Sequence, residues 1–257
     1  MFSVCILLYG DHPALAERCL KSIRDSANWP YIQDIRIGLN AVSTATRDVV
    51  HEIMRGAPVP RYLYEPEGSQ NVLKYPLMRR MFFDDQRPLS SYVMWFDDDS
   101  YIREKDRDWW VLVHTHAKQF PLVGSAWFLR AGFRPRQHAG IKAQPWYRGK
   151  PIPHNPSFAT GGWWTLWSSV IEEWNYPFPE LHGNGGDSIL GEMIRQLDLG
   201  WCRFNTGVAI NAGDSGVESS SKRRGKTTAW PWQSYDPRQP ADLRHHDFVH
   251  TVTTMEE

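Results

Sequence analysis

Three consecutive carboxylates, Asp97, Asp98 and Asp99, give this sequence its clearest potential for chemistry. They directly follow residues 92–96, an apolar run with the composition of a buried strand. In an open α/β sheet, ligands bind at the carboxyl ends of the strands, so this cluster is predicted to lie at a binding site. Because side chains alternate along an extended chain, Asp97 and Asp99 are expected to point the same way and to share one cation.

Carboxylate oxygens without a neighbouring cysteine suit a hard divalent ion, Mg²⁺ or Mn²⁺, whose coordination is completed by phosphate oxygens of a substrate. The three cysteines, Cys5, Cys19 and Cys202, have no C-x-x-C spacing, so neither a disulfide framework nor a thiolate zinc site is predicted. The alternative for the aspartates is a solvated acidic turn or a helix cap. Such a turn rarely follows so apolar a strand, which favours the metal site.

Two glycine-rich segments precede predicted helices and bring further functional groups to the helix starts. Residues 161–164, Gly-Gly-Trp-Trp, come before a helix predicted from about 165 to 174. Residues 183–187 end in Asp187 and open a helix predicted at 188–197. Glycine lets a backbone approach a substrate closely, whereas aspartate at a helix start is also what capping alone favours.

The elements that must position these groups alternate apolar, β-rich runs with stretches of helical period. Strands are predicted at residues 3–9, 32–39, 61–64, 91–96, 122–129 and 202–210, and helices at 12–26, 43–54, 70–83, 104–118, 165–174 and 188–197. Asp11 and Ser43 are predicted N-caps, and Pro76 is expected to kink the third helix. Residues 131–156 have no clear period and are predicted to form a loop or insertion. The alternation indicates the α/β class, with a parallel sheet covered by helices.

Composition excludes several classes of protein. The 257 residues carry 29 Lys and Arg against 29 Asp and Glu, so the chain is not a polyelectrolyte. Its 41% hydrophobic and 23% charged residues exclude disorder, collagen and coiled coil for the whole chain. The 13 tryptophans exceed what packing alone requires, and indole faces stack on sugars and bases. With no basic region at the start and no apolar run of about 20 residues, a cytoplasmic protein without a membrane span is predicted.

In the order of its elements and motifs, the stretch 2–204 resembles the nucleotide-sugar glycosyltransferases of the GT-A fold, particularly family 2. The likeness rests on the first strand and helix, the second strand at 35–40, the D-x-D element, the Gly-Gly pair and the acidic residue that opens a late helix. It implies a Rossmann-like α/β/α fold, with a mostly parallel central sheet flanked by helices and a D-x-D metal site. Residues 1–129 would form the donor-binding half, 130–212 the acceptor-binding and catalytic half of the same domain, and 213–257 a tail closing over the donor.

The resemblance implies a metal-dependent enzyme of the hexosyltransferase type, which transfers a sugar from a nucleotide sugar, a UDP-sugar, to an acceptor hydroxyl with inversion. Carried over by position, the resemblance makes Asp187 the catalytic base, and the metal ligands are Asp97, Asp99 and His246. The donor-binding residues are Tyr9, Asp11, Asn40, Lys74, Asp97 and Asp98. The acceptor-binding residues are Gly161, Gly162, Trp163 and Trp164. The ion, Mn²⁺ or Mg²⁺, would neutralise the departing diphosphate.

Each carried-over role has a structural alternative. Asp11 is also a good N-cap, Asn40 a good turn residue, and either tryptophan can be a core residue. Asn40 stands where many members of the family have Asp, so the nucleobase of the donor is left open. Gly186 stands where members of the family often have a second acidic residue. As a capping residue, Asp187 would have its pKa lowered by amide contacts. In the tail, candidate metal ligands and phosphate partners are His245, His246, His250, Lys222, Arg223, Arg224 and Lys226.

The acceptor is left open between a saccharide and a hydroxymethylated base in DNA. Arg130, Arg134, Arg136 and the basic run at 222–226 favour DNA, whereas zero net charge does not.

Two other functions compete with glycosyl transfer. A haloacid dehalogenase-type phosphohydrolase also places two Asp after an apolar strand, but expects Thr or Val where this chain has Tyr101. A non-enzymatic, tryptophan-rich carbohydrate-binding protein would need neither nucleotide nor metal.

Overall fold

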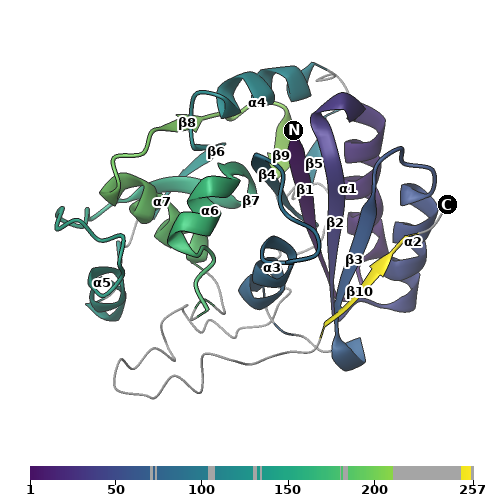
Figure 1. Ribbon diagram of the computed structural model, residues 1–257, viewed down its shortest axis with the longest axis horizontal. Helices are drawn as coiled ribbons and strands as arrows, with labels where there is room; N and C mark the ends of the chain where they lie inside the picture. The colour runs from purple at the N-terminus through teal and green to yellow at the C-terminus, as the bar shows by residue number, and fades with distance from the viewer. Residues whose placement is uncertain are drawn as a thin grey trace.

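An eight-stranded sheet forms the centre of the protein, in the order β10-β3-β2-β1-β4-β7-β6-β8 (Figure 1). The computed structural model describes residues 1–69, 72, 74–103, 108–129, 132–133, 135–179, 181, 185–210 and 250–255. The strands of this sheet are β1 (Phe2–Tyr9), β2 (Ile32–Asn40), β3 (Arg61–Pro66), β4 (Tyr92–Asp97), β6 (Leu122–Phe128), β7 (Ser157–Trp167), β8 (Trp201–Arg203) and β10 (His250–Thr254). Only β7 and β10 run antiparallel to their neighbours among these strands, so the predicted α/β class with a mostly parallel sheet is confirmed.

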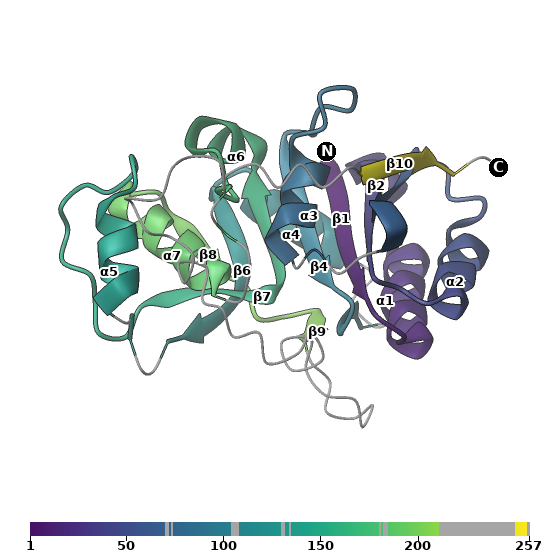
Figure 2. The same cartoon turned by 90° about the horizontal axis from the view of Figure 1, so that it is seen from below.

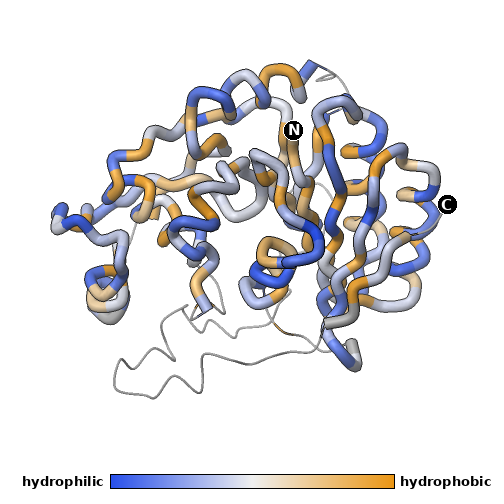
Figure 3. The backbone as a smooth tube through the Cα atoms, viewed as in Figure 1, coloured by the Kyte–Doolittle hydropathy of each residue, from blue (hydrophilic) through white to orange (hydrophobic). Residues whose placement is uncertain are grey.

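Helices cover both faces of the sheet. One face packs against α1 (Pro13–Ser26), α2 (Thr44–Met54) and α4 (Trp109–Ala117), and the other against α3 (Lys74–Phe82), α5 (Pro135–Lys142), α6 (Ser168–Trp174) and α7 (Gly186–Gln196). In β1, Val4 and Ile6 enter the first core, whereas Cys5 and Leu7 enter the second, as strand alternation requires. Hydrophobic residues accordingly gather on the central strands and alternate with hydrophilic ones along α1 and α2 (Figure 3).

Short elements complete the described part of the chain. β5 (Ser100–Ile102) and β9 (Val208–Ile210) form a two-stranded sheet, and η1 (Trp29–Tyr31) and η2 (Glu67–Ser69) are single 3₁₀ turns. β10 brings the end of the chain back to β3, where it adds an edge strand to the sheet (Figure 2). Among the described residues, no helix has the length and apolar character that a membrane crossing needs.

The helix starts agree with prediction at one position and differ at two. Ser43 caps α2, since its hydroxyl accepts a hydrogen bond from the Thr46 N–H at 3.2 Å. The N-cap of α1 is His12, not the expected Asp11, which lies one residue further out. Helix α3 begins at Lys74, so Pro76 lies in the first turn, where its missing N–H removes no intrahelical bond and no kink is needed.

The second half of the chain departs further from the predicted elements. The Gly-Gly-Trp-Trp segment does not precede a helix; it lies inside β7, and α6 starts only at Ser168. The strand expected at 202–210 is two strands, β8 and β9, and the expected loop contains α5. The sequence pattern does not predict the edge strand β10. Because β7 is buried on both faces, its sequence has no period-two pattern that would predict a strand. In the sequence the two glycines therefore indicate the entrance to a helix instead.

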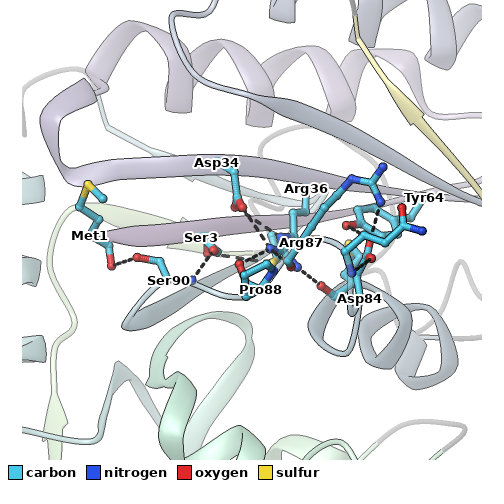
Figure 4. Close-up of polar contacts among 12 residues, drawn as sticks. Met1, Ser3, Asp34, Arg36, Tyr64, Asp84, Arg87, Pro88 and Ser90 are labelled. Atoms are coloured by element: carbon cyan, nitrogen blue, oxygen red, sulfur yellow. Dashed lines mark hydrogen bonds and ion pairs between the residues drawn. The ribbon is translucent and has the colours of Figure 1, made fainter.

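A buried arginine on β2 fixes the connection between α3 and β4 (Figure 4). The Arg36 guanidinium is fully buried and pairs with Asp34 at 3.0 Å. It also donates to the main-chain oxygens of Met81 at 2.5 Å, Arg87 at 2.5 Å and Pro88 at 2.9 Å. These bonds satisfy one carbonyl in the last turn of α3 and two in the connection to β4, and thereby tie both to β2.

Removing this guanidinium should destabilise the fold strongly. Arg36→Met leaves the Asp34 carboxylate buried without its partner, and we expect the free energy of unfolding to fall by about 3–5 kcal/mol. Urea unfolding followed by circular dichroism measures the change. The control is Arg24→Met, which breaks the exposed pair with Asp25 and should leave stability nearly unchanged. Equal stability of the two variants would contradict a role for Arg36 in holding α3.

Candidate active site

The three aspartates lie where β4 ends at the carboxyl edge of the sheet. Asp97 is the last residue of β4, and Asp98 and Asp99 form the turn into β5. All three are at most 5% exposed. The expectation that Asp97 and Asp99 point the same way assumed an extended chain, and it does not apply because the chain turns between them.

Lys74, the first residue of α3, meets Asp97 in the interior. Its ammonium lies 2.8 Å and 2.9 Å from the two carboxylate oxygens, and both residues are at most 5% exposed. The Trp95 indole N–H donates to Oδ1 of the same carboxylate at 3.0 Å, and the indole ring lies 5.3 Å from the ammonium. A charged pair so deeply buried must be well hydrogen-bonded to be tolerated.

Two glycines interrupt the pairing of β7 at this point. β4 pairs with β7 only from Trp163 onward, and the register between β6 and β7 shifts beside Gly161 and Gly162. Main-chain groups that a regular ladder would use therefore bind side chains. The Gly161 C=O accepts from the Lys74 ammonium at 2.8 Å, and the Gly161 N–H donates to Asp187 Oδ2 at 3.0 Å.

A side chain at either glycine would disturb these contacts. A Cβ on Gly161 would lie 3.2 Å from Asp187 Oδ2 and 3.3 Å from the Lys74 ammonium. A Cβ on Gly162 would lie 2.4 Å from a methyl group of Ile210. Protein side chains therefore lie close to the main chain at both glycines, and the predicted contact of this pair with an acceptor stays a prediction.

Asp187 lies in the first turn of α7, next to Gly161. The N-cap is Gly185, so the carboxylate is not the cap that sequence favoured. Its Oδ1 accepts from the Ser188 N–H at 2.9 Å. Desolvation raises the pKa of Asp187 above its ordinary value, although Lys74 and the two N–H donors act in the opposite direction. The expected lowering of this pKa by amide contacts is therefore wrong, because burial outweighs them.

Gly186, the residue before Asp187, has no room for a side chain. A Cβ there would lie 2.3 Å from the Tyr75 ring. Tyr75 follows Lys74 in α3, so the same helix that supplies the ammonium also fills the space beside Asp187. The single acid at this position follows from the packing of α3 against α7.

Trp163 and Trp164 are core residues. They are 0% and 1% exposed; Trp163 packs on Trp109, and Trp164 stacks on Trp95 with ring centroids 6.0 Å apart. A sugar cannot reach either indole face, so the alternative of core packing holds and the predicted acceptor contact does not.

The remaining donor candidates lie at the ends of the first two strands. Tyr9 is the last residue of β1, and Asp11 lies two residues beyond it, exposed to solvent. Asn40 ends β2 fully buried, and its side-chain oxygen accepts from the Val72 N–H at 3.0 Å. Asn40 is therefore a buried residue at a strand end, and it binds the main chain of Val72, two residues before Lys74. Contacts of these residues with a nucleotide stay predictions.

A divalent ion fits part of the predicted ligand set. The oxygens of Asp97 accept hydrogen bonds from Lys74 and Trp95, and its role as a metal ligand stays a prediction. Asp99 and Asp98 supply the hard carboxylate oxygens that Mg²⁺ and Mn²⁺ prefer. Within the described ranges no three His, Cys, Asp or Glu side chains are grouped as a metal site. His245, His246 and the basic run at 222–226 lie outside the described residues, as do Arg130, Arg134 and the side chain of Arg136. His250 is the first residue of β10, and its side chain is not among those described.

Sequence reasoning missed Trp95 and Ser100. Trp95 lies two residues before Asp97 on a strand, so alternation places both on one side and provided the signal. Ser100 donates its hydroxyl to the Gly162 C=O at 2.8 Å across 62 residues of sequence, a contact for which the sequence holds no local signal.

Comparison with known proteins finds similarity in structure alone. No family model and no curated protein matches the chain. The mannosyltransferase PcManGT from Pyrobaculum calidifontis, solved with GDP-Man and Mn²⁺, matches with a TM-score of 0.52 and 14% identity over 80% of this chain and 55% of its own. S. aureus TarS, residues 1–349, matches with a TM-score of 0.52 and 10% identity, over 84% of this chain and 61% of the TarS chain. The chain thus spans less than two thirds of either structure. At these identities the likeness shows the fold, and the predicted GT-A glycosyltransferase fold is confirmed.

The buried ion pair gives a test of the site's architecture. Lys74→Met leaves the Asp97 carboxylate buried without its ammonium, so we expect the free energy of unfolding to fall by about 3–5 kcal/mol. The double variant Lys74→Met/Asp97→Asn removes the stranded charge and should recover part of that loss. Lys150→Met, which breaks a pair with the exposed Asp198, is the control in the same denaturant titration. A double variant no more stable than the single one would refute the pairing.

Proposed function

We propose that this chain is a glycosyltransferase, which moves a sugar from a nucleotide sugar to an acceptor hydroxyl. One observation carries the proposal: Lys74 and Asp187 both bind the Gly161 main chain, and Lys74 also pairs with Asp97, at the carboxyl edge of a sheet with a glycosyltransferase fold. Open α/β sheets bind their ligands at this edge.

Asp187 is the general base of the proposed reaction. It accepts the proton of the acceptor hydroxyl while the acceptor oxygen bonds to the anomeric carbon and the bond from that carbon to the diphosphate breaks. Two N–H donors, from Gly161 and Ser188, fix the direction of the carboxylate. Burial raises its pKa, which makes it a stronger proton acceptor than an ordinary aspartate once it is ionised. Attack opposite the leaving group inverts the anomeric centre.

Asp99, with Asp98 beside it, would hold the divalent ion, and the donor's diphosphate would supply further oxygens. When bound, the ion neutralises charge that develops on the leaving nucleoside diphosphate. PcManGT is described with Mn²⁺ and GDP-Man, which supports a metal and a nucleotide-sugar donor here. The residues Tyr9, Asp11 and Asn40 do not distinguish a UDP-sugar from a GDP-sugar, so experiment must identify the nucleobase of the donor.

The competing interpretations receive less support. Six of the tryptophans, Trp95, Trp109, Trp110, Trp146, Trp163 and Trp164, are fully buried in the core. These six side chains therefore serve packing, and they do not argue for a non-enzymatic carbohydrate-binding protein. The haloacid dehalogenase-type interpretation gains nothing from the fold comparison.

The assignment of the base predicts a specific kinetic defect. Asp187→Asn keeps the shape of the side chain but removes its basicity, so transfer should fall by roughly 10²–10⁴-fold with donor affinity nearly unchanged. In the wild type, kcat/KM should fall as pH drops through the raised pKa of Asp187, above the ordinary value of about 3.9, since only the ionised form accepts a proton. Asp25→Asn, on the surface, is the control. Near-normal transfer by the Asp187→Asn variant would exclude this base.

The assignment of the metal ligand is tested by binding alone. Calorimetry with UDP and with GDP should show tighter binding in Mn²⁺ than in a chelator, and Asp99→Ala should abolish the difference. Asp11→Ala, an exposed carboxylate at the same edge, should retain the metal effect. Affinity indifferent to both Mn²⁺ and Asp99 would reject the ligand assignment.

A further inference from the structure

Helix α1 contacts the main chain of the turn and the short strand that follow β4. Nη2 of Arg18 donates to the Asp99 C=O at 3.4 Å. One turn further along the same face of the helix, the Ser22 hydroxyl accepts a hydrogen bond from the Ile102 N–H at 3.0 Å. The turn that carries Asp99 and the strand β5 are therefore both held from α1.

The guanidinium of Arg18 has a second partner in this segment. Its Cζ lies 4.6 Å from the centre of the Tyr101 ring, within the range of a cation–π contact. Stacking fixes the plane of the guanidinium and thereby gives a direction to the long hydrogen bond to Asp99. Among the described residues, Nε of Arg18 is buried without a hydrogen-bond partner. Since such a buried N–H is costly, the contacts with Asp99 and Tyr101 must offset its desolvation.

The residues on either side of the turn are fixed by other elements. Before the turn, the Asp97 carboxylate is held by its buried ion pair. After the turn, the Ser100 hydroxyl donates to the Gly162 C=O at 2.8 Å. Asp99 lies between these two anchors, and Arg18 binds its main chain from α1. The position of Asp99 therefore depends on α1 as well as on the central sheet.

We propose that Arg18 is a positioning residue for Asp99, the metal ligand of the proposed function. By holding the main chain of Asp99, Arg18 limits the directions in which the carboxylate can point. The ligand is thus oriented before a divalent ion and a diphosphate bind, which lowers the cost of ordering it. Arg18 itself contacts neither the ion nor the donor. The inference rests on the proposed function, because it concerns the residue assigned there to the metal.

The charge of Arg18 acts in the opposite sense to its hydrogen bond. A cation near the acidic turn repels a divalent ion, so removing the guanidinium would strengthen Mn²⁺ binding if charge alone mattered. Arg18 is only partly buried, however, so solvent and salt screen its charge. Partners that orient a metal ligand typically change metal affinity by about 10–100-fold when they are removed. The loss of orientation should therefore outweigh the loss of repulsion.

Binding of Mn²⁺ to the full chain tests the positioning role without turnover. Titrations with UDP or GDP present, followed by the electron paramagnetic resonance signal of free Mn²⁺, give the metal affinity. We expect Arg18→Met to weaken Mn²⁺ binding by about tenfold or more. Arg18→Lys keeps a donor for the Asp99 C=O but lacks the planar stack on Tyr101, so it should recover part of the affinity.

Ser22→Ala is the matched control on the same helix. It leaves the Ile102 N–H without its partner and should therefore destabilise the fold, which urea unfolding measures for both variants. Ile102 lies beyond the anchor at Ser100, so the Mn²⁺ affinity of Ser22→Ala should stay near that of the wild type. An equal loss of Mn²⁺ affinity in Ser22→Ala and Arg18→Met would show that any weakening of α1 has this effect, and would overturn the proposal.

Kinetics supply a second readout. Arg18→Met should raise the Mn²⁺ concentration needed for half-maximal transfer, whereas the rate at saturating Mn²⁺ and its pH dependence should stay near those of the wild type, since Asp187 is unchanged. A lower rate at saturating Mn²⁺ with an unchanged Mn²⁺ requirement would contradict a positioning role for Arg18.

The remaining outcomes separate this inference from the proposed function. Unchanged or tighter Mn²⁺ binding by Arg18→Met, with wild-type binding dependent on Asp99, overturns the positioning role alone. Mn²⁺ binding that needs both Asp99 and Arg18, in a protein that transfers no sugar, overturns the glycosyltransferase and leaves the positioning role. Absence of Asp99-dependent Mn²⁺ binding in the wild type overturns the metal assignment and the role of Arg18 with it.

Discussion

The contact of the Lys74 ammonium with the Asp97 carboxylate and the Gly161 carbonyl is the constraint on which the site depends. A buried ammonium must find such partners, because its desolvation costs several kcal/mol. These partners come from β4 and β7, and the same glycine donates its N–H to Asp187 on α7. The helices α3 and α7, which are far apart in sequence, therefore meet at Gly161 of β7. This is possible only because β7 leaves its pairing at Gly161, since a regular ladder would have consumed both main-chain groups.

Helix α3 connects this contact to the rest of the fold. Its first residue enters the site, and its last turn is held by Arg36 from β2, a strand that also delivers Asn40 to the segment before α3. Both ends of the helix are thus fixed by buried polar groups. On the N-terminal side of Gly161, β7 pairs with the end of β6, so one interrupted strand joins the contact of Asp187 to the outer part of the sheet.

Two kinds of feature could be predicted from the sequence: helices and strands with a clear hydrophobic period, and functional residues whose side-chain type indicates their chemistry. The amphipathic pattern of α1 and the apolar run of β4 placed the aspartates at the correct edge, and Asp187 was found as an acid in a helix start. Long-range effects were not predictable. The partner of Lys74 lies 87 residues away at Gly161, the strand β7 hides its period because both faces are buried, and the raised pKa of Asp187 depends on desolvation by the whole fold. Composition likewise could not distinguish the buried tryptophans from the exposed Trp127.

The account's central claim is that the carboxyl edge around Gly161 is where a nucleotide sugar reacts. A crystal structure with a nucleoside diphosphate and Mn²⁺ tests it most directly. The account predicts the diphosphate beside the turn that follows β4, the ion on the Asp99 carboxylate, and Asp187 facing the open side of the terminal phosphate with its contact to Gly161 intact. A nucleotide bound at another face of the sheet, or an ion that does not contact Asp98 or Asp99, would contradict it.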